Sequence, residues 1–227
     1  MMATFLIETS LAIYVGFRYS SGVFRTLACV LLLCLASFQL AEFQVCVGPS
    51  AWALVWGKVG LAGITLLPAL GMHLIGTVTR KSPLIGIGYA VAAIYEITFL
   101  LVPSATGQPE CAGNYVIIQI SSGWFNGIYS AYYFSFLLLA MLELTLRLTQ
   151  RDPPPGLGYS NRLIALMLAG YLSFTVPMAI TSLLSPELRR ATPSIMCGFA
   201  LILAVILAGY VAPLYAQEAR AIKRPAV

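Results

Sequence analysis

The feature that most constrains this chain is a near-continuous succession of apolar runs. Of its 227 residues, 59% are hydrophobic and 9% are charged, whereas soluble domains carry about a quarter charged residues. The apolar runs lie at about 3–17, 24–45, 52–77, 84–103, 125–148, 162–184 and 193–215. Backbone polar groups in hydrocarbon must be satisfied within each segment, so each run is expected to be an α-helix. The sequence therefore predicts an all-α membrane bundle with about seven transmembrane helices.

The orientation follows from the basic residues, because short loops rich in Lys and Arg stay in the cytoplasm. The connection after the second run has no Lys or Arg, and the connection after the fourth has only Glu110. The pair Arg189–Arg190 after the sixth run is the one exception to the alternation. An N-terminus outside and a C-terminus inside place these basic residues in the cytoplasm: Arg18, Arg25, Arg80, Lys81, Arg147, Arg151, Arg162, Arg220, Lys223 and Arg224.

The domain organisation predicted from these runs is simple. Residues 1–216 form one seven-helix transmembrane domain, and residues 217–227 form a short cytoplasmic tail. The stretch 115–123 is apolar but short, and we expect a re-entrant or interfacial piece there. The basic residues stand singly or in pairs at the ends of apolar runs, which argues against nucleic acid as a partner. The expected partner is the lipid bilayer.

Two of the five cysteines are predicted to form a disulfide. Cys29, Cys34 and Cys197 fall inside apolar runs, where a thiol usually serves as a small packing group. Cys46 and Cys111 fall in the two connections assigned to the outside, where disulfides persist. A bridge would close a loop of roughly 64 residues and contribute about 3 to 4 kcal/mol. The alternative is two unpaired thiols at the membrane interface.

Four charged residues lie in the outer halves of four different runs, namely Glu8, Glu42, Lys58 and Glu96. Ionisable groups inside a membrane are costly and often functional, so we expect a polar pocket open to the outside, with Lys58 paired to Glu96 or Glu42. The alternatives are a structural salt bridge and long side chains that reach the headgroups. Further candidate lining residues are Gln39, Tyr95, Asn126, Tyr129, Tyr132 and Tyr133, and the candidate rim residues are Trp52, Trp56 and Trp124. The tryptophans also suit an ordinary interfacial belt.

Other polar residues suggest packing roles. His73 has no second ligand at metal-binding spacing, so we expect an interhelical hydrogen bond and not a metal or haem ligand. Glu143 and Arg147 are four residues apart, which suits an exposed ion pair on one helix. Small residues at spacing three allow a neighbouring helix to approach closely, and the third run carries them at Gly57, Gly60 and Gly63.

Signatures of soluble-type catalysis are missing from the sequence. It has no phosphate-binding glycine loop, no Cys and His cluster, and no Ser, His and acid set in one compartment. The seventh run has no lysine, which removes the Schiff base of a retinal protein despite the matching number of helices. We therefore predict no enzyme activity, no metal site and no cofactor.

One stretch of the chain resembles a known family. The third run reads Trp56-Gly-Lys-Val-Gly-Leu-Ala-Gly-Ile-Thr-Leu-Leu-Pro-Ala-Leu-Gly-Met-His73 and is followed by Arg80-Lys81. With the preceding Phe38-Gln-Leu-Ala-Glu42, this is similar to the N-terminal seven-helix sensory region of bacterial histidine kinases and related signalling proteins. The resemblance implies a sensor in the bacterial inner (cytoplasmic) membrane, and it carries over no catalytic residue. That family usually continues into a sensory or kinase domain, whereas this sequence ends at Val227.

Two functions from different classes remain open at this point. The first is a receptor-like module that binds a small molecule or lipid from the outer side and signals through a separate partner or a homo-oligomer. The second is an accessory structural subunit of a larger membrane complex of the energy-converting type, with no ligand of its own. A small transporter ranks third, because the odd number of helices argues against two inverted halves.

Overall fold

A helix forms at each of the seven predicted apolar runs. The computed structural model describes residues 1–20, 22–79, 84–113, 115–120, 123–150, 159–185 and 191–223. The first four long helices are α1 (Met2–Arg18), α2 (Val23–Val47), α3 (Ala53–Thr79) and α4 (Ile85–Leu101). The later ones are α5 (Gly123–Thr149), α6 (Asn161–Leu184), α8 (Thr192–Ile206) and α9 (Ala212–Lys223). Single helical turns precede α3 and follow α4, at η1 (Ser50–Trp52) and η2 (Pro103–Ala105).

Length and apolar composition identify a multi-pass membrane protein. Among the described residues, five helical stretches are long and apolar enough to cross a membrane: Val23–Val47, Ser50–Thr79, Gly123–Thr149, Asn161–Leu184 and Thr192–Ile222. Helices α1 and α4 have 17 residues each. That corresponds to about 25 Å of helix, which is at the short limit for a span. The total of seven spans and their orientation remain predictions.

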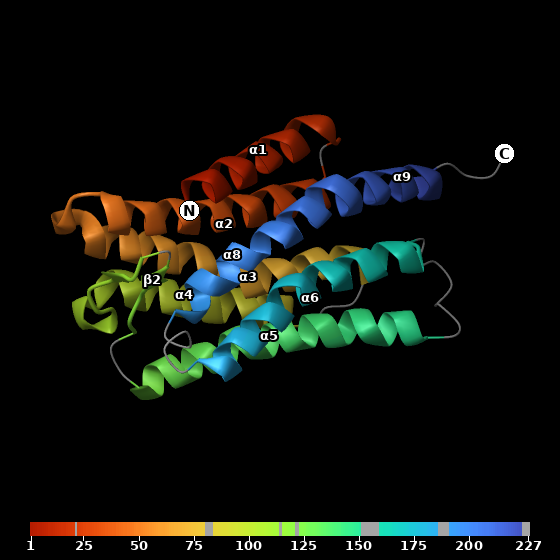
Figure 1. The fold of residues 1–227 in the computed structure, drawn as a ribbon. Coiled ribbons are helices and arrows are strands. Elements are labelled where there is room, and N and C mark those ends of the chain that lie inside the picture. Colours follow the sequence, from red (N-terminus) through yellow and green to blue (C-terminus); the bar gives the residue numbers. More distant parts are fainter. Residues whose placement is uncertain are drawn as a thin grey trace.

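The helices run back and forth along one long direction (Figure 1). We call the end that carries a small β-hairpin the hairpin end and the opposite end, where the chain finishes, the far end. Each of the five arginines in the described residues lies at or near a helix terminus at the far end: Arg18, Arg25, Arg147, Arg162 and Arg220. The described arginines that the orientation prediction uses therefore gather at one end of the folded bundle. The basic loops 80–83 and 151–158 and the pair at 189–190 lie outside the described residues.

Close packing of α2 on α3 depends on glycines. A Cβ atom added at Gly63 would lie 2.5 Å from the Ser37 hydroxyl and 2.9 Å from the Cys34 carbonyl oxygen, both in α2. At Gly60 the same atom would be 3.2 Å from Phe38 of α2. At Gly57 the added Cβ atom would instead be 3.2 Å from Cγ of Pro109, in the loop after α4. The predicted role in close helix approach is confirmed for Gly60 and Gly63, whereas Gly57 allows the close approach of a loop.

The hairpin joins β1 (Glu110–Cys111) to β2 (Val116–Ile117) in antiparallel register. The predicted disulfide is confirmed, because Cys111 of β1 is bonded to Cys46 near the end of α2, with their Cα atoms 5.2 Å apart. The stretch 115–123, where a re-entrant or interfacial piece is expected, contains β2, and its position relative to the membrane remains a prediction. Its backbone groups pair with the preceding strand, and a further bridge joins Thr106 to Ile120.

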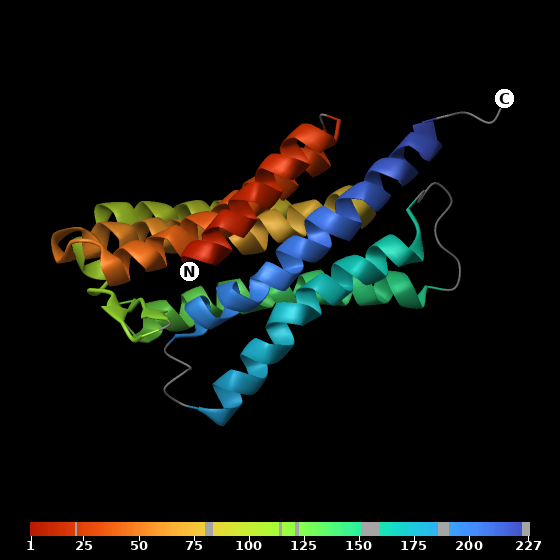
Figure 2. The ribbon, with the colours of Figure 1, turned by 45° about the horizontal axis from the view of Figure 1, so that its top comes forward.

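The last helix is longer than the sequence predicts. Helix α8 continues through a π-helical turn, η3 (Leu207–Val211), into α9, and Figure 2 shows this continuous helix crossing the bundle obliquely. Residues 217–223, which were expected to be tail, belong to α9. Glu218 anchors them, since its carboxylate accepts a 2.8 Å hydrogen bond from the Ser160 N–H and a second bond from the Ser160 hydroxyl. This contact holds α9 at the first turn of α6.

His73 has the packing role expected from the sequence. Its Nδ1 atom is 3.2 Å from the Tyr89 hydroxyl, and the two rings meet edge to face. The bond joins α3 to α4, so the prediction of an interhelical hydrogen bond is confirmed.

A candidate ligand pocket at the hairpin end

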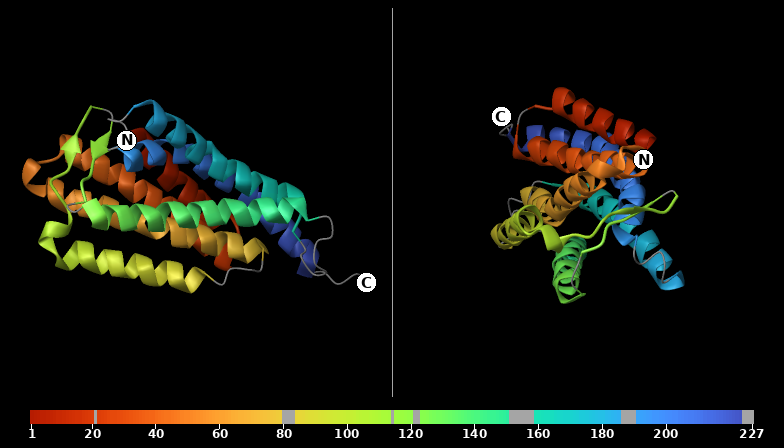
Figure 3. Two further views of the ribbon diagram at one scale, coloured as in Figure 1. Left: turned by 90° about the horizontal axis from the view of Figure 1, so that it is seen from below. Right: turned by 90° about the vertical axis from the view of Figure 1, so that its left-hand side faces the viewer.

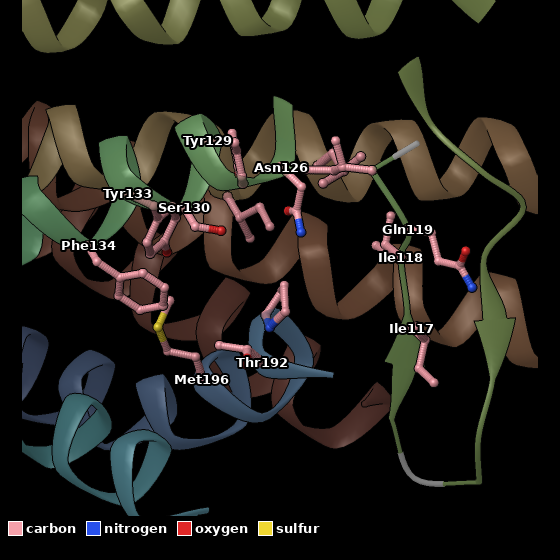
Figure 4. A pocket seen from close by; sticks show the side chains of 14 residues that line it. Ile117, Ile118, Gln119, Asn126, Tyr129, Ser130, Tyr133, Phe134, Thr192 and Met196 are labelled. Atoms are coloured by element: carbon pink, nitrogen blue, oxygen red, sulfur yellow. The ribbon is translucent and has the colours of Figure 1, made fainter. Parts of the chain in front are cut away.

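A cavity of about 510 Å³ lies at the hairpin end between α3, α5, the start of α8 and the strand segment that leads out of the hairpin. Figure 4 shows its lining side chains grouped around this space, and the left view of Figure 3 shows the hairpin above the end of α5. The lining residues are Leu61, Ile64, Ile117, Ile118, Gln119, Ile120, Asn126, Tyr129, Ser130, Tyr133, Phe134, Thr192, Pro193 and Met196. Three of them, Asn126, Tyr129 and Tyr133, are residues that the sequence predicts for a pocket.

Helix α5 supplies one wall of the cavity. Asn126, Tyr129, Ser130 and Tyr133 are spaced by three and four residues, so they lie on one face of the helix. The facing wall is built by β2 and the three residues after it, 118–120, whose position depends on the hairpin. The disulfide that holds the hairpin to α2 therefore also holds this wall in place.

The lining is mainly apolar with a few polar groups. Gln119 and Asn126 contribute amides, and Ser130 contributes a hydroxyl. No charged side chain of the described residues belongs to the lining. Binding sites for small molecules have this composition and this size, in which an apolar surface gives affinity and a few polar groups set orientation. The cavity suits an uncharged amphipathic molecule, and the charged residues predicted for a pocket, Glu8, Glu42, Lys58 and Glu96, do not line it.

Aromatic residues behind the cavity hold α5 against α3 and α4. The Tyr129 hydroxyl is 3.0 Å from Thr65 Oγ1, and the Tyr132 hydroxyl donates a 3.0 Å bond to the Thr65 carbonyl. Tyr95 of α4 meets Tyr129 edge to face, with ring centroids 5.0 Å apart. Tyr95, predicted as a lining residue, thus supports the wall from behind and does not reach the cavity. The hydroxyl of Tyr129 is engaged by Thr65, so its ring is the part that faces a ligand.

A buried carboxyl cluster lies between α1, α2 and α8. Glu8 of α1 is fully buried, Glu42 of α2 is 3% exposed, and the two interact electrostatically. Both oxygens of Glu8 and Oε1 of Glu42 have no hydrogen-bond partner among the described residues. Gln39 lies on the same face of α2, one turn before Glu42, and its Oε1 accepts a 2.9 Å bond from the Thr4 hydroxyl. The structure thus groups three of the predicted residues, but away from the cavity.

Ser194 joins this carboxyl cluster to the cavity wall. Its hydroxyl accepts a 3.2 Å hydrogen bond from the Val116 N–H of β2, and both groups lie near the Glu42 carboxylate. Its chain neighbours Thr192, Pro193 and Met196 belong to the lining. The cluster therefore sits directly behind the part of the wall that α8 and β2 form.

The other two predicted ions stand apart. Lys58 and Glu96 are half-buried, and neither lines the cavity. Glu96 Oε1 is buried and has no hydrogen-bond partner in the described chain, so it does not bond Lys58. Trp52 and Trp124 are 58% and 72% exposed and do not line the cavity either. This placement agrees with a belt at the membrane interface.

Several lining residues were missed from the sequence. Ser130 could have been found, because it shares the helical spacing of Asn126 and Tyr133. Gln119 and Met196 carried no such signal, since the hairpin and the start of α8 meet only in the folded chain.

The fold and the cavity define a polytopic helical membrane protein with a largely apolar pocket at one end of the bundle. No protein-family model matches the chain, and no curated protein matches it in sequence.

Proposed function

We propose that this protein is a receptor-like membrane module that binds a small, uncharged amphipathic molecule or a lipid at the hairpin end. The observation that supports this function best is the cavity of about 510 Å³ with its apolar lining and few polar groups. The proposed module has no enzyme activity and signals through a separate protein or through a second copy of itself.

The proposed orientation places the hairpin end outside and the far end in the cytoplasm of a bacterium, with seven spans in the inner membrane. Two observations support it. The disulfide between Cys46 and Cys111 lies at the hairpin end, and disulfides persist outside the cytoplasm. The described arginines gather at the opposite end, as the positive-inside rule requires of a cytoplasmic face.

The ligand-binding function can be tested by filling the cavity. Ser130→Phe adds a ring where the small Ser130 side chain lines the space. Ser135→Phe adds the same ring on an exposed position of the same helix and serves as the matched control. Each protein would be purified in mild detergent and analysed by native mass spectrometry for small molecules that remain bound.

A bound small molecule in the wild type and in Ser135→Phe, lost in Ser130→Phe, is the expected result. Equal retention in all three proteins would place the molecule elsewhere and overturn the pocket. If every variant purifies without a small molecule and in a stable complex with other membrane proteins, the receptor function is wrong. The protein would then be an accessory subunit.

A further inference from the structure

A second cavity, of about 360 Å³, lies at the far end between the connection from α1 to α2 and helix α9. Its lining combines apolar residues such as Val15, Phe24 and Ile222 with two arginines, Arg25 and Arg220. This combination differs from that of the pocket at the hairpin end, whose described lining has no charge.

Stacked aromatic rings form one wall of this cavity. The rings of Phe24 and Tyr215 stack with centroids 3.9 Å apart, and those of Tyr159 and Tyr215 stack at 4.9 Å. The stack joins α2 and α9 to Tyr159, which lies two residues before the start of α6. Together with the bond from Ser160 to Glu218, it fixes α9 beside the cavity and therefore fixes the position of Arg220.

Arg25 is held in place by one nitrogen of its guanidinium group, and its other hydrogen-bond donors are not used for this. Its Nη1 donates to the carbonyl oxygens of Gly16 and Tyr19, at 3.3 and 3.4 Å, and so caps the end of α1. Its Nη2 and Nε groups form no hydrogen bond with the described residues. Arg220 is exposed and reaches the cavity from the opposite wall. Two cations thus face one space between apolar walls.

The acidic groups of the described residues at this end form hydrogen bonds with other partners and not with this pair. At this end of the described chain, Glu218 is the nearest carboxylate in sequence to Arg220, and both its oxygens accept bonds from Ser160. Glu143 belongs to α5, and its Oε1 accepts the Thr79 hydroxyl. Arg18 and Arg162, both exposed, add positive charge to the same end. An anion entering the cavity would meet a positive field.

We propose that this cavity binds the phosphate group of an anionic phospholipid, with Arg25 and Arg220 as its ligands. Guanidinium groups bind phosphate oxygens through paired hydrogen bonds, and basic pockets at helix ends recognise anionic headgroups. The apolar wall of Val15, Phe24 and Ile222 accepts the glycerol and first methylenes of the lipid, which a free phosphate ion would leave uncovered. A lipid in the leaflet at the far end therefore fits both parts of the cavity.

The test compares lipids and variants in nanodiscs. The protein would be reconstituted in phosphatidylcholine nanodiscs with and without phosphatidylglycerol, and lipid retained after gentle release would be counted by native mass spectrometry. The wild type should retain phosphatidylglycerol in preference to phosphatidylcholine. Arg220→Gln, which removes an exposed side chain, should weaken that retention by about tenfold. Arg162→Gln, at the same end but outside the cavity, is the matched control and should behave as the wild type.

Arg25→Gln should weaken retention as well, but it also removes the cap of α1, so Arg220→Gln carries the conclusion. Inorganic phosphate added in excess to protein in detergent should compete only weakly. Full displacement of phosphatidylglycerol by inorganic phosphate would identify a free anion as the ligand and overturn the proposal of a lipid site. Equal loss in Arg162→Gln and Arg220→Gln would show attraction to the whole basic end and no defined site.

Discussion

Arg147 of α5 donates a 3.1 Å hydrogen bond to the backbone carbonyl of Thr79, the last residue of α3. In the same contact the Thr79 hydroxyl donates to Glu143, one turn earlier in α5. Arg147 is only 7% exposed, so the expectation of an exposed ion pair with Glu143 is wrong. The two side chains are spaced for each other along α5, but both point at α3, and the end of that helix satisfies them.

Arg147→Met should lower the stability of the bundle by about 2 kcal/mol, because the charge-assisted hydrogen bond to the Thr79 carbonyl is lost. Thermal unfolding in detergent would measure the change. Arg162→Met, on an exposed position at the same end, should have little effect. Equal effects of the two variants would contradict a stabilising role for the bond between Arg147 and Thr79.

Glu8→Met should raise stability, by about 1 to 3 kcal/mol, since Glu8 is fully buried and neither oxygen has a partner in the described chain. Gln39→Met offers a matched change on the adjacent helix that removes the bond from Thr4. It should lower stability. Both variants would be measured in one thermal unfolding assay. Effects of opposite sign would confirm that Glu8 has no hydrogen-bond partner and that Gln39 has one.

Gly63→Ala should destabilise the protein, because the new methyl group would lie 2.9 Å from the Cys34 backbone oxygen and could fit only if α2 moved away. Gly127→Ala, in α5, has open space around the added atom. It should be neutral or slightly stabilising, since alanine favours a helix by about 0.5 to 1 kcal/mol. A lower melting temperature for Gly127→Ala than for Gly63→Ala would exclude this account of the α2 and α3 contact.

The double change Cys46→Ser with Cys111→Ser should cost about 3 to 4 kcal/mol, through the longer reach of the unfolded chain. The control Cys29→Ser replaces a half-buried free thiol. Reducing agent should lower the melting temperature of the wild type and leave that of the double variant unchanged.

Topology can be checked with a cysteine at each end of the bundle. Gln108→Cys, exposed in the loop before the hairpin, should react in intact cells with a maleimide that cannot cross the membrane. Gln217→Cys, exposed on α9, should react only after the cells are opened. The reversed pattern would invert the orientation and with it the outer location of the pocket.

The helices were predictable from hydropathy because each apolar run is bounded by breakers or charges. The end of α9 was not, since residues 217–223 are polar enough to read as tail and become helical through a contact with Ser160, distant in sequence. The hairpin was hidden for a different reason. Its strands have two residues each, too few to show alternation, and a bond to Cys46 holds them.

Sequence position gives the depth of a residue in the membrane but not the direction in which it points. Depth alone placed Glu8, Glu42, Lys58 and Glu96 together. The rotation of each helix about its own axis depends on packing, and this rotation puts Glu8 beside Glu42 and leaves Glu96 Oε1 without a partner in the described chain. Asn126, Tyr129 and Tyr133 were placed correctly relative to one another because they share a single helix.

The continuous helix from α8 to α9 touches both cavities, with Thr192 and Met196 in the lining of one and Tyr215 and Arg220 in the lining of the other. The stretch Thr192–Ile222 has 31 residues and measures roughly 45 Å. Because the same helix contributes to both linings, a displacement of this helix along its axis would change both cavities. The π-turn at Leu207–Val211 is the one part of this continuous helix where the hydrogen-bond spacing departs from that of an α-helix. A shift of α8 by one residue relative to α9 would be absorbed there. One continuous helix thus contributes to the lining of both cavities, at opposite ends of the bundle.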